Sequence, residues 1–245
     1  MVMQEGIRIA KFIAQSGYCS RRKAEEFIES REVKVNGEII TNPATHVTIR
    51  DKIEIQDKVL SKAASQARLW LYYKPNGLIT SHKDTHDRTT VFETLPEDLP
   101  RVISVGRLDL NSEGLLLLTN SGKLARYLEL PSTALQRVYK VRAFGELDLR
   151  ELKKLEKGMT IEGVSYKPAK IELIKAGTNS WFKVTLTEGK NREIRKIFSH
   201  FNLSVNRLIR IKYGPFDIED LEPCGLKEVP NYKLINHLPE EILKL

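Results

Sequence analysis

The residues best suited to chemistry lie in one glycine-bounded segment of the 245-residue sequence, between Gly106 and Gly114. Asp109 supplies a carboxylate, and Arg107, two residues earlier, supplies a guanidinium group. Four leucines follow at positions 115–118, and a short apolar run bounded by turn residues is typical of a buried central strand. We therefore expect Asp109 to lie on an ordered loop that enters a rigid strand, where a reactive carboxylate is held in a fixed geometry.

Two other interpretations of this segment must be weighed. The side chains from Asp109 to Gly114 resemble the start of a calcium-binding loop, but such a loop requires a bidentate glutamate at its twelfth position, where Asn120 stands. The leucines would also have to leave the core, so we exclude calcium. A purely structural role stays open, in which Asp109 caps a turn and Arg107 forms a surface ion pair.

The composition and the charge narrow the class of protein. Hydrophobic residues make up 41% of the sequence, enough for a folded core, and the formal net charge of +8 suits a polyanionic partner. The two cysteines, Cys19 and Cys224, are too far apart in sequence for a zinc or disulfide pattern. No apolar run approaches membrane-spanning length. We therefore expect a soluble, cytoplasmic, monomeric protein without a membrane segment or a metal site.

Residues 1–60 are predicted to form a small domain. Apolar residues recur at helical spacing in 7–13 and again in 21–29, and Ser20 is the expected N-cap of the second helix. Further on, Asn36–Gly37 separates two alternating segments, which is the strongest short-range signal for a β-hairpin. The small domain should therefore contain two helices followed by a hairpin.

This order of elements resembles the S4 RNA-binding domain. The resemblance rests on Arg8-x-x-Lys11, on the stretch from Ser20 to Ile28 and on Val33–Gly37. Basic side chains and free helix N–H groups can bind phosphates together, and these are the candidates for RNA contact: Arg8, Lys11, Arg21, Arg22 and Lys23. Because three glutamates follow in the second helix, a solvated charged helix face is the alternative interpretation.

A larger domain is expected at 69–245, joined to the first by a small, polar linker at 61–68. Its first strand is predicted at 69–73, and the turn that follows should direct Lys74 out of the end of the sheet, towards RNA. The polar loop after this turn adds a second candidate RNA contact, Arg88.

A second concentration of basic residues follows a strand that is predicted at 137–144 and carries Tyr139. Between residues 185 and 214, seven basic residues stand against two acidic ones, a net charge of +5. This part begins with glycine and asparagine and then becomes helical, so basic side chains gather at a helix start. Three of them are candidates for phosphate contact: Lys190, Arg192 and Lys196. A charged, solvated helix face is again the alternative.

Three separated motifs together resemble the pseudouridine synthases. They are the segment from Gly106 to Asn120, the strand with Tyr139, and Leu186-Thr-Glu-Gly-Lys-Asn-Arg continuing to Arg195; the turn from Lys74 to Gly77 also fits. The motifs are similar to the branch that modifies bacterial ribosomal RNA and carries an N-terminal S4 domain. The resemblance implies an α+β fold, with the S4 domain followed by a catalytic domain built on a mixed, mainly antiparallel sheet flanked by helices and loops.

The resemblance also implies roles for four residues. Asp109 would be the nucleophile that attacks a flipped-out uridine, either at ring carbon 6 or at the sugar C1′. Arg195 would be the charge partner that favours the ionised carboxylate. Arg107 would hold the phosphate of the flipped nucleotide, and Tyr139 would stack on the uracil. The predicted product is a pseudouridine in ribosomal RNA, with 23S as the expected target.

This chemistry is redox-neutral, and we expect no cofactor. The chain has no phosphate loop, no dinucleotide fingerprint and no zinc-deaminase signature. The expected partner is ribosomal RNA or a ribosomal precursor particle. The competing hypothesis is a non-catalytic S4-type RNA-binding or ribosome-assembly factor. It accounts for the charge and for residues 1–60 but not for the joint presence of Asp109, Arg107 and Tyr139.

Overall fold

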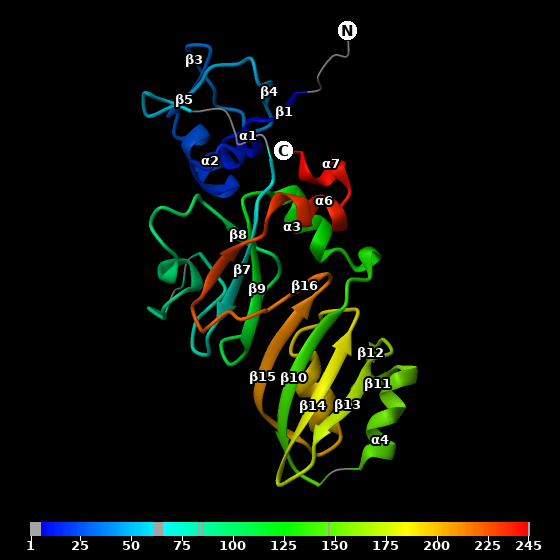
Figure 1. Ribbon diagram of the computed structural model, residues 1–245. Coiled ribbons are helices and arrows are strands. Elements are labelled where there is room, and N and C mark those ends of the chain that lie inside the picture. The colour runs from blue at the N-terminus through cyan, green and yellow to red at the C-terminus, as the bar shows by residue number, and fades with distance from the viewer. Residues whose placement is uncertain (1–5, 61–65, 83, 85, 147, 245) are drawn as a thin grey trace.

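The structure is a computed structural model that describes residues 6–60, 66–82, 84, 86–146 and 148–244 (Figure 1). The described chain forms a small N-terminal unit and a larger part built on one extended sheet. The first five residues of the predicted linker, 61–65, lie outside the described residues. Within the described chain no helix has the length and apolar character that crossing a membrane would require.

The N-terminal unit contains the two predicted helices and the predicted hairpin. Ser20 caps the second helix by accepting a hydrogen bond from the backbone N–H of Lys23 at 3.1 Å. The hairpin turn has positive φ at both Asn36 and Gly37, as a tight two-residue turn demands. Its elements are β1 (Ile7–Arg8), α1 (Ile9–Gln15), α2 (Arg21–Glu29), β2 (Val33–Val35), β3 (Glu38–Ile39), β4 (His46–Val47), β5 (Ile53–Ile55) and β6 (Lys58–Val59).

The larger part is built on a mixed sheet, as predicted. Its main path runs β13-β14-β10-β15-β9-β7-β17, with β16 beside β15 and β8 beside β9. In the described residues the pairing of β15 with β9 is parallel and the other pairings of this sheet are antiparallel. Its strands are β7 (Leu69–Lys74), β8 (Ile103–Ser104), β9 (Glu113–Thr119), β10 (Arg137–Phe144), β13 (Lys170–Lys175), β14 (Asn179–Leu186), β15 (Ser204–Tyr213), β16 (Phe216–Asp217) and β17 (Leu226–Glu228).

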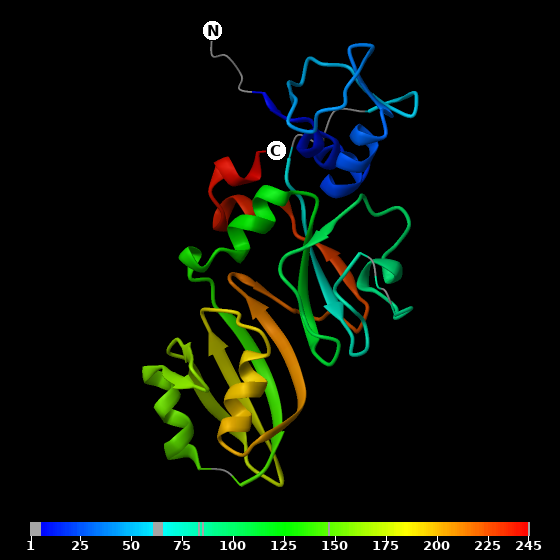
Figure 2. The same cartoon turned by 180° about the vertical axis from the view of Figure 1, so that it is seen from behind.

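Helices cover parts of this sheet. Figure 2 shows α5 in front of β10, β14 and β15, whereas the opposite face of the same strands is turned to the viewer and uncovered in Figure 1. The remaining elements are the helices α3 (Gly122–Glu129), α4 (Leu149–Lys153), α5 (Glu193–His200), α6 (Asn231–His237) and α7 (Glu240–Leu243), the short 3₁₀ turns η1 (Val91–Thr94), η2 (Pro131–Thr133) and η3 (Lys154–Lys157), and the β11 (Met159–Ile161) and β12 (Val164–Tyr166) pair.

The predicted buried strand is β9, and its four leucines are fully buried. Because side chains alternate along a strand, Leu116 and Leu118 enter the core beneath α5, while Leu115 and Leu117 enter a second core with α3, α6 and α7. The strand is therefore held on both faces, and the loop before it starts from a rigid base.

Gly114 makes the junction of β9 with β15 possible. Its φ is +99°, and an added Cβ would lie 2.2 Å from the carbonyl oxygen of Arg210, its register partner in the parallel pair. An L side chain is disfavoured by that conformation and excluded by that contact.

We expect Gly114→Ala to lower the free energy of unfolding by at least about 3 kcal/mol, because the clash is with backbone that cannot rotate away. Gly163→Ala is the matched control: Gly163 also has positive φ, +77°, but an added Cβ would meet nothing within 4 Å. The control substitution should lower the free energy of unfolding by only about 1 kcal/mol. Denaturant unfolding measures both, and equal losses would contradict the close-approach argument.

Candidate active site

Asp109 lies on the loop that joins β8 to β9, as predicted. Its side chain is half-buried, and its backbone carbonyl accepts a hydrogen bond of 3.0 Å from the N–H of Ser112, which closes a turn. The neighbouring Arg107 is exposed. The loop is held through its backbone, so the carboxylate itself stays available.

Lys74 does not point out of the sheet, so the predicted RNA contact there is wrong. The side chain is fully buried, and its ammonium donates to the carbonyls of Ser112 at 2.9 Å, Pro75 at 3.0 Å and Leu110 at 3.4 Å. Burial lowers the pKa of Lys74 to about 8, although the charges of Asp109 and Glu113 oppose this effect. The lysine fastens the loop from beneath rather than meeting a phosphate.

Thr80 and Gly77 hold the same loop from a second side. The Thr80 hydroxyl donates to the carbonyl of Leu108 at 2.9 Å and lies 3.3 Å from the Leu108 N–H, which donates back to it. The N–H of Gly77 donates to the carbonyl of Leu110 at 2.9 Å. The residues on either side of Asp109 are thus fixed by partners from one preceding segment.

Arg195 holds the loop from a third side. Its guanidinium donates to the carbonyl of Asn111 at 2.7 Å and to that of Val205 at 2.8 Å. Among the ion pairs of the described residues, none joins Arg195 to Asp109. Burial and the nearby Arg192 lower the pKa of Arg195, whereas Asp109 raises it, so the carboxylate is within electrostatic reach. The side chain of Arg195 therefore binds a backbone carbonyl of the loop, a contact that the sequence motif did not indicate.

A cavity of about 620 Å³ opens beside the loop, over the face of the sheet that carries Tyr139. Tyr139 is almost fully buried on β10, between Val184 of β14 and Arg210 of β15. The cavity is lined by five of the predicted site residues: Arg107, Asp109, Tyr139, Lys190 and Arg192. Four charged residues that are not among the predicted site residues also line it: Glu129, Arg137, Glu193 and Arg210.

The other predicted RNA contacts do not line this cavity. Arg88 is paired with Asp84 at 2.8 Å in the polar loop, and Lys196 is exposed on α5. The remaining predicted contacts are exposed on the N-terminal unit: Arg8, Lys11, Arg21, Arg22 and Lys23. Their contact with RNA stays a prediction, and Lys23 is already paired with Glu26 at 2.8 Å.

Glu193 fixes the basic loop at the cavity mouth. It is buried at the start of α5, and one carboxylate oxygen accepts from the backbone N–H of Lys190 at 2.9 Å. The other oxygen is buried and has no hydrogen-bond partner among the residues that the structure describes. Burial, reinforced by the charge of Glu188, raises the pKa of Glu193 to about 7, against the opposing effect of the Lys190 N–H. No sequence signal indicated this buried acid.

Replacing Lys74 should loosen the loop. In Lys74→Met we expect the backbone N–H groups of Gly77 and Ser112 to exchange with solvent about 10-fold faster or more, because their acceptors lie on the loop that the ammonium fixes. Amide hydrogen exchange read by NMR measures this. Lys175→Met, at an exposed lysine of β13, is the control. Unchanged exchange in Lys74→Met would show that the lysine does not stabilise the loop.

Glu193→Gln should make stability less dependent on pH. The carboxyl ionises near pH 4.5 in the unfolded chain and near pH 7 in the folded one, so the folded state carries no penalty below pH 4.5 and loses stability as the pH rises to 7. We therefore expect the variant to be more stable than the native protein by about 1–2 kcal/mol above pH 7, with no gain below pH 4.5. Unfolding at several pH values tests this, with exposed Glu29→Gln as control. A gain independent of pH would contradict the assigned ionisation.

Comparison with known proteins identifies the family. Residues 68–200 match the family model described as RNA pseudouridylate synthase, and residues 7–53 match the S4 domain. A Rickettsia felis protein named "Uncharacterized RNA pseudouridine synthase" is 56% identical over 225 residues, which span 91% of this chain and 97% of the relative. The "Ribosomal large subunit pseudouridine synthase B" of Yersinia pestis is 37% identical over 96% of this chain and 76% of its own length.

A solved structure supports the fold. The crystal structure of a pseudouridylate synthase matches with a TM-score of 0.67 and 24% sequence identity, over 95% of this chain and 100% of that one. The likeness agrees with an N-terminal S4 domain followed by a mixed-sheet α+β domain. The chain therefore belongs to the RNA pseudouridylate synthase family and is an enzyme that isomerises uridine to pseudouridine in RNA.

Proposed function

We propose that this enzyme isomerises one or more uridines of large-subunit (23S) ribosomal RNA, with Asp109 as the nucleophile. The observation that carries the proposal is the half-buried Asp109 side chain beside a basic cavity, on a loop whose backbone is fixed from three sides. A reacting group held in this way needs no reorganisation when substrate arrives, and such pre-positioning removes part of the activation barrier.

The reaction breaks the bond between the sugar C1′ and N1 of uracil and forms a bond from C1′ to C5. The proton of C5 leaves and N1 gains one, so atoms and electrons balance without a cofactor. A carboxylate can divide this exchange into two easier steps by forming and releasing a covalent intermediate. Attack at C6 and attack at C1′ both suit a carboxylate, and the proposal covers either.

The remaining cavity residues suit a flipped nucleotide. The volume of about 620 Å³ lies within the range of ~300–1,000 Å³ that is typical of small-molecule sites. Tyr139 offers an aromatic face in the cavity floor on which uracil can stack. Arg107 is exposed at the edge and can take the phosphate of the flipped nucleotide. Arg195 acts on Asp109 at a distance, through its positive charge and its bond to Asn111.

The choice of ribosomal RNA is supported by similarity and by the N-terminal unit. The Yersinia pestis relative is named for the ribosomal large subunit. Residues 1–60, the proposed S4 domain, carry exposed basic side chains on two helices, and such side chains bind RNA backbone without reading sequence. We further propose that 61–68 links this domain to a catalytic domain at 69–245, and that the enzyme acts as a cytoplasmic monomer on ribosomal RNA or a precursor particle.

Asp109→Asn should abolish the modification while leaving RNA binding intact. We expect one or more pseudouridines to disappear from 23S ribosomal RNA in cells that carry only the variant, and turnover to fall by at least about 10³-fold. Pseudouridine mapping measures the first effect, and a filter-binding assay measures retained affinity. Asp98→Asn, at an exposed aspartate, is the control.

The outcomes separate the hypotheses. If the 23S map is unaltered in Asp109→Asn but some other RNA loses a pseudouridine, the ribosomal target is wrong and the nucleophile is right. If every map is unaltered and turnover persists, Asp109 is not the nucleophile.

A further inference from the structure

Two arginines with no part in the proposed chemistry lie in the floor of the cavity. Arg137 of β10 and Arg210 of β15 are 7% and 3% exposed. In the pairing of these strands Arg137 lies opposite Tyr213 and Arg210 lies opposite Tyr139. Both guanidinium groups contact the ring of Tyr213, with the central carbon 4.6 Å and 5.1 Å from its centroid. Two like charges are thus buried against one aromatic ring.

The hydrogen bonds of these arginines go to neutral groups. Arg137 donates to the hydroxyl of Tyr213 at 2.7 Å and to the carbonyls of Leu135 and Thr187 at 3.0 Å and 3.4 Å. The Nε of Arg210 donates to the carbonyl of Leu115 at 2.7 Å. The Nη2 atom of Arg210 is buried and has no hydrogen-bond partner within the described chain. A strong donor of Arg210, a residue that lines the cavity, is therefore left without an acceptor.

Among the ion pairs formed within the described chain, none includes Arg137 or Arg210. Three acids line the cavity against five basic residues. Of these acids, Glu129 accepts a hydrogen bond from the N–H of Gly106 at 2.7 Å, and the raised pKa of Glu193 favours its neutral form. Burying a charge without a partner is costly, and such charges in proteins are normally paired. The third acid, Asp109, is the proposed nucleophile and forms no ion pair with either arginine in the part of the chain that the structure describes. An anion from outside the chain can therefore pair with these two charges.

We propose that Arg137 and Arg210 form a binding site for a backbone phosphate of the RNA, separate from the exposed Arg107. Phosphate is the anion that RNA carries, and guanidinium groups bind it with two parallel hydrogen bonds. Tyr213 and the neutral acceptors hold both groups in place before RNA arrives, so little side-chain order is lost on binding. The inference rests on the proposed function only in taking this phosphate to be one next to the target nucleotide.

Binding of a short oligouridylate at several salt concentrations tests the site. Each phosphate contact contributes about 0.7 to the slope of log affinity against log salt for a single strand. In Arg210→Gln and in Arg137→Gln we expect the slope to flatten by about 0.7 and the affinity at low salt to fall about 10-fold or more. Fluorescence polarisation of a labelled oligouridylate measures both quantities, and thermal unfolding verifies that each variant is folded.

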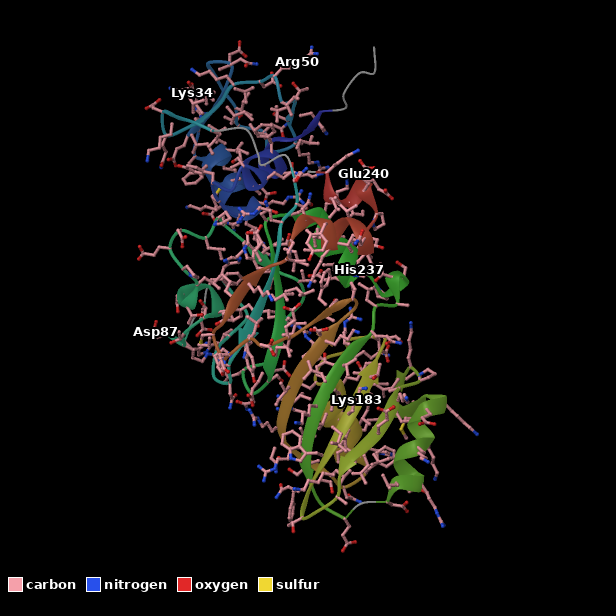
Figure 3. All side chains as sticks on the ribbon, in the orientation of Figure 1. Lys34, Arg50, Asp87, Lys183, His237 and Glu240 are labelled. Atoms are coloured by element: carbon pink, nitrogen blue, oxygen red, sulfur yellow. The ribbon has the colours of Figure 1, made fainter. Side chains whose placement is uncertain are left out.

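Arg142→Gln is the matched control, because Arg142 lies on the same strand but is exposed. Side chains alternate along β10, so Arg142 and Lys140 lie on the open face of the sheet. Lys183, which is labelled in Figure 3, is the register partner of Lys140 and lies on the same face. This control should keep the native slope. Arg210→Lys retains the charge but not the planar fork, so it should restore the slope and only part of the affinity.

The outcomes are distinct. An unchanged slope in both Arg210→Gln and Arg137→Gln overturns the proposal. A loss of affinity without a change of slope also overturns it, since the arginines would then contact uracil carbonyls rather than phosphate. The assay involves neither turnover nor a ribosomal target, so its result is independent of the pseudouridine map in Asp109→Asn.

Discussion

The hydrogen bonds to the backbone of residues 108–112 are the constraint on which the candidate site depends. Three side chains supply most of them, and each donates to a carbonyl of the loop: Lys74, Thr80 and Arg195. Because the backbone carbonyls take these bonds, the carboxylate of Asp109 needs no structural partner of its own. Buried donors that satisfy a loop in this way stabilise one conformation strongly, since each broken bond would leave a polar group unpaired. The loop therefore presents a free carboxylate on a rigid support.

The sheet brings the cavity walls to this loop. Gly114 lets β9 approach β15 in parallel, and that junction sets Arg210 and Tyr139 beside the end of the loop. The leucines of β9 enter cores on both faces, so the junction cannot shift without disturbing both. Beside the same cavity, Glu193 fixes the turn that carries Lys190. One sheet thus joins segments that are far apart in sequence. They supply the acid Asp109, the aromatic ring of Tyr139 and the basic side chain of Lys190.

Local sequence patterns were sufficient to predict the helices and strands but not the side-chain contacts between them. The leucine run predicted β9, and Asn36–Gly37 predicted the hairpin, because each depends on residues adjacent in sequence. Lys74 was misjudged since a lysine before a proline turn looks exposed, whereas strand β7 is buried along most of its length and carries the ammonium under the loop. Arg137 and Arg210 are 73 residues apart in the sequence. They could not be recognised as a pair, because only the register of β10 with β15 brings them to one ring.

The structure of the enzyme bound to its RNA substrate would test most directly whether a pre-formed loop presents Asp109 to uridine. The account predicts that residues 107–112 keep their free conformation within about 1 Å. It also predicts that a flipped uridine lies in the cavity with the Asp109 carboxylate about 3–3.5 Å from C6 or C1′. A target uridine bound elsewhere, or a loop that must refold before Asp109 reaches the base, would contradict it.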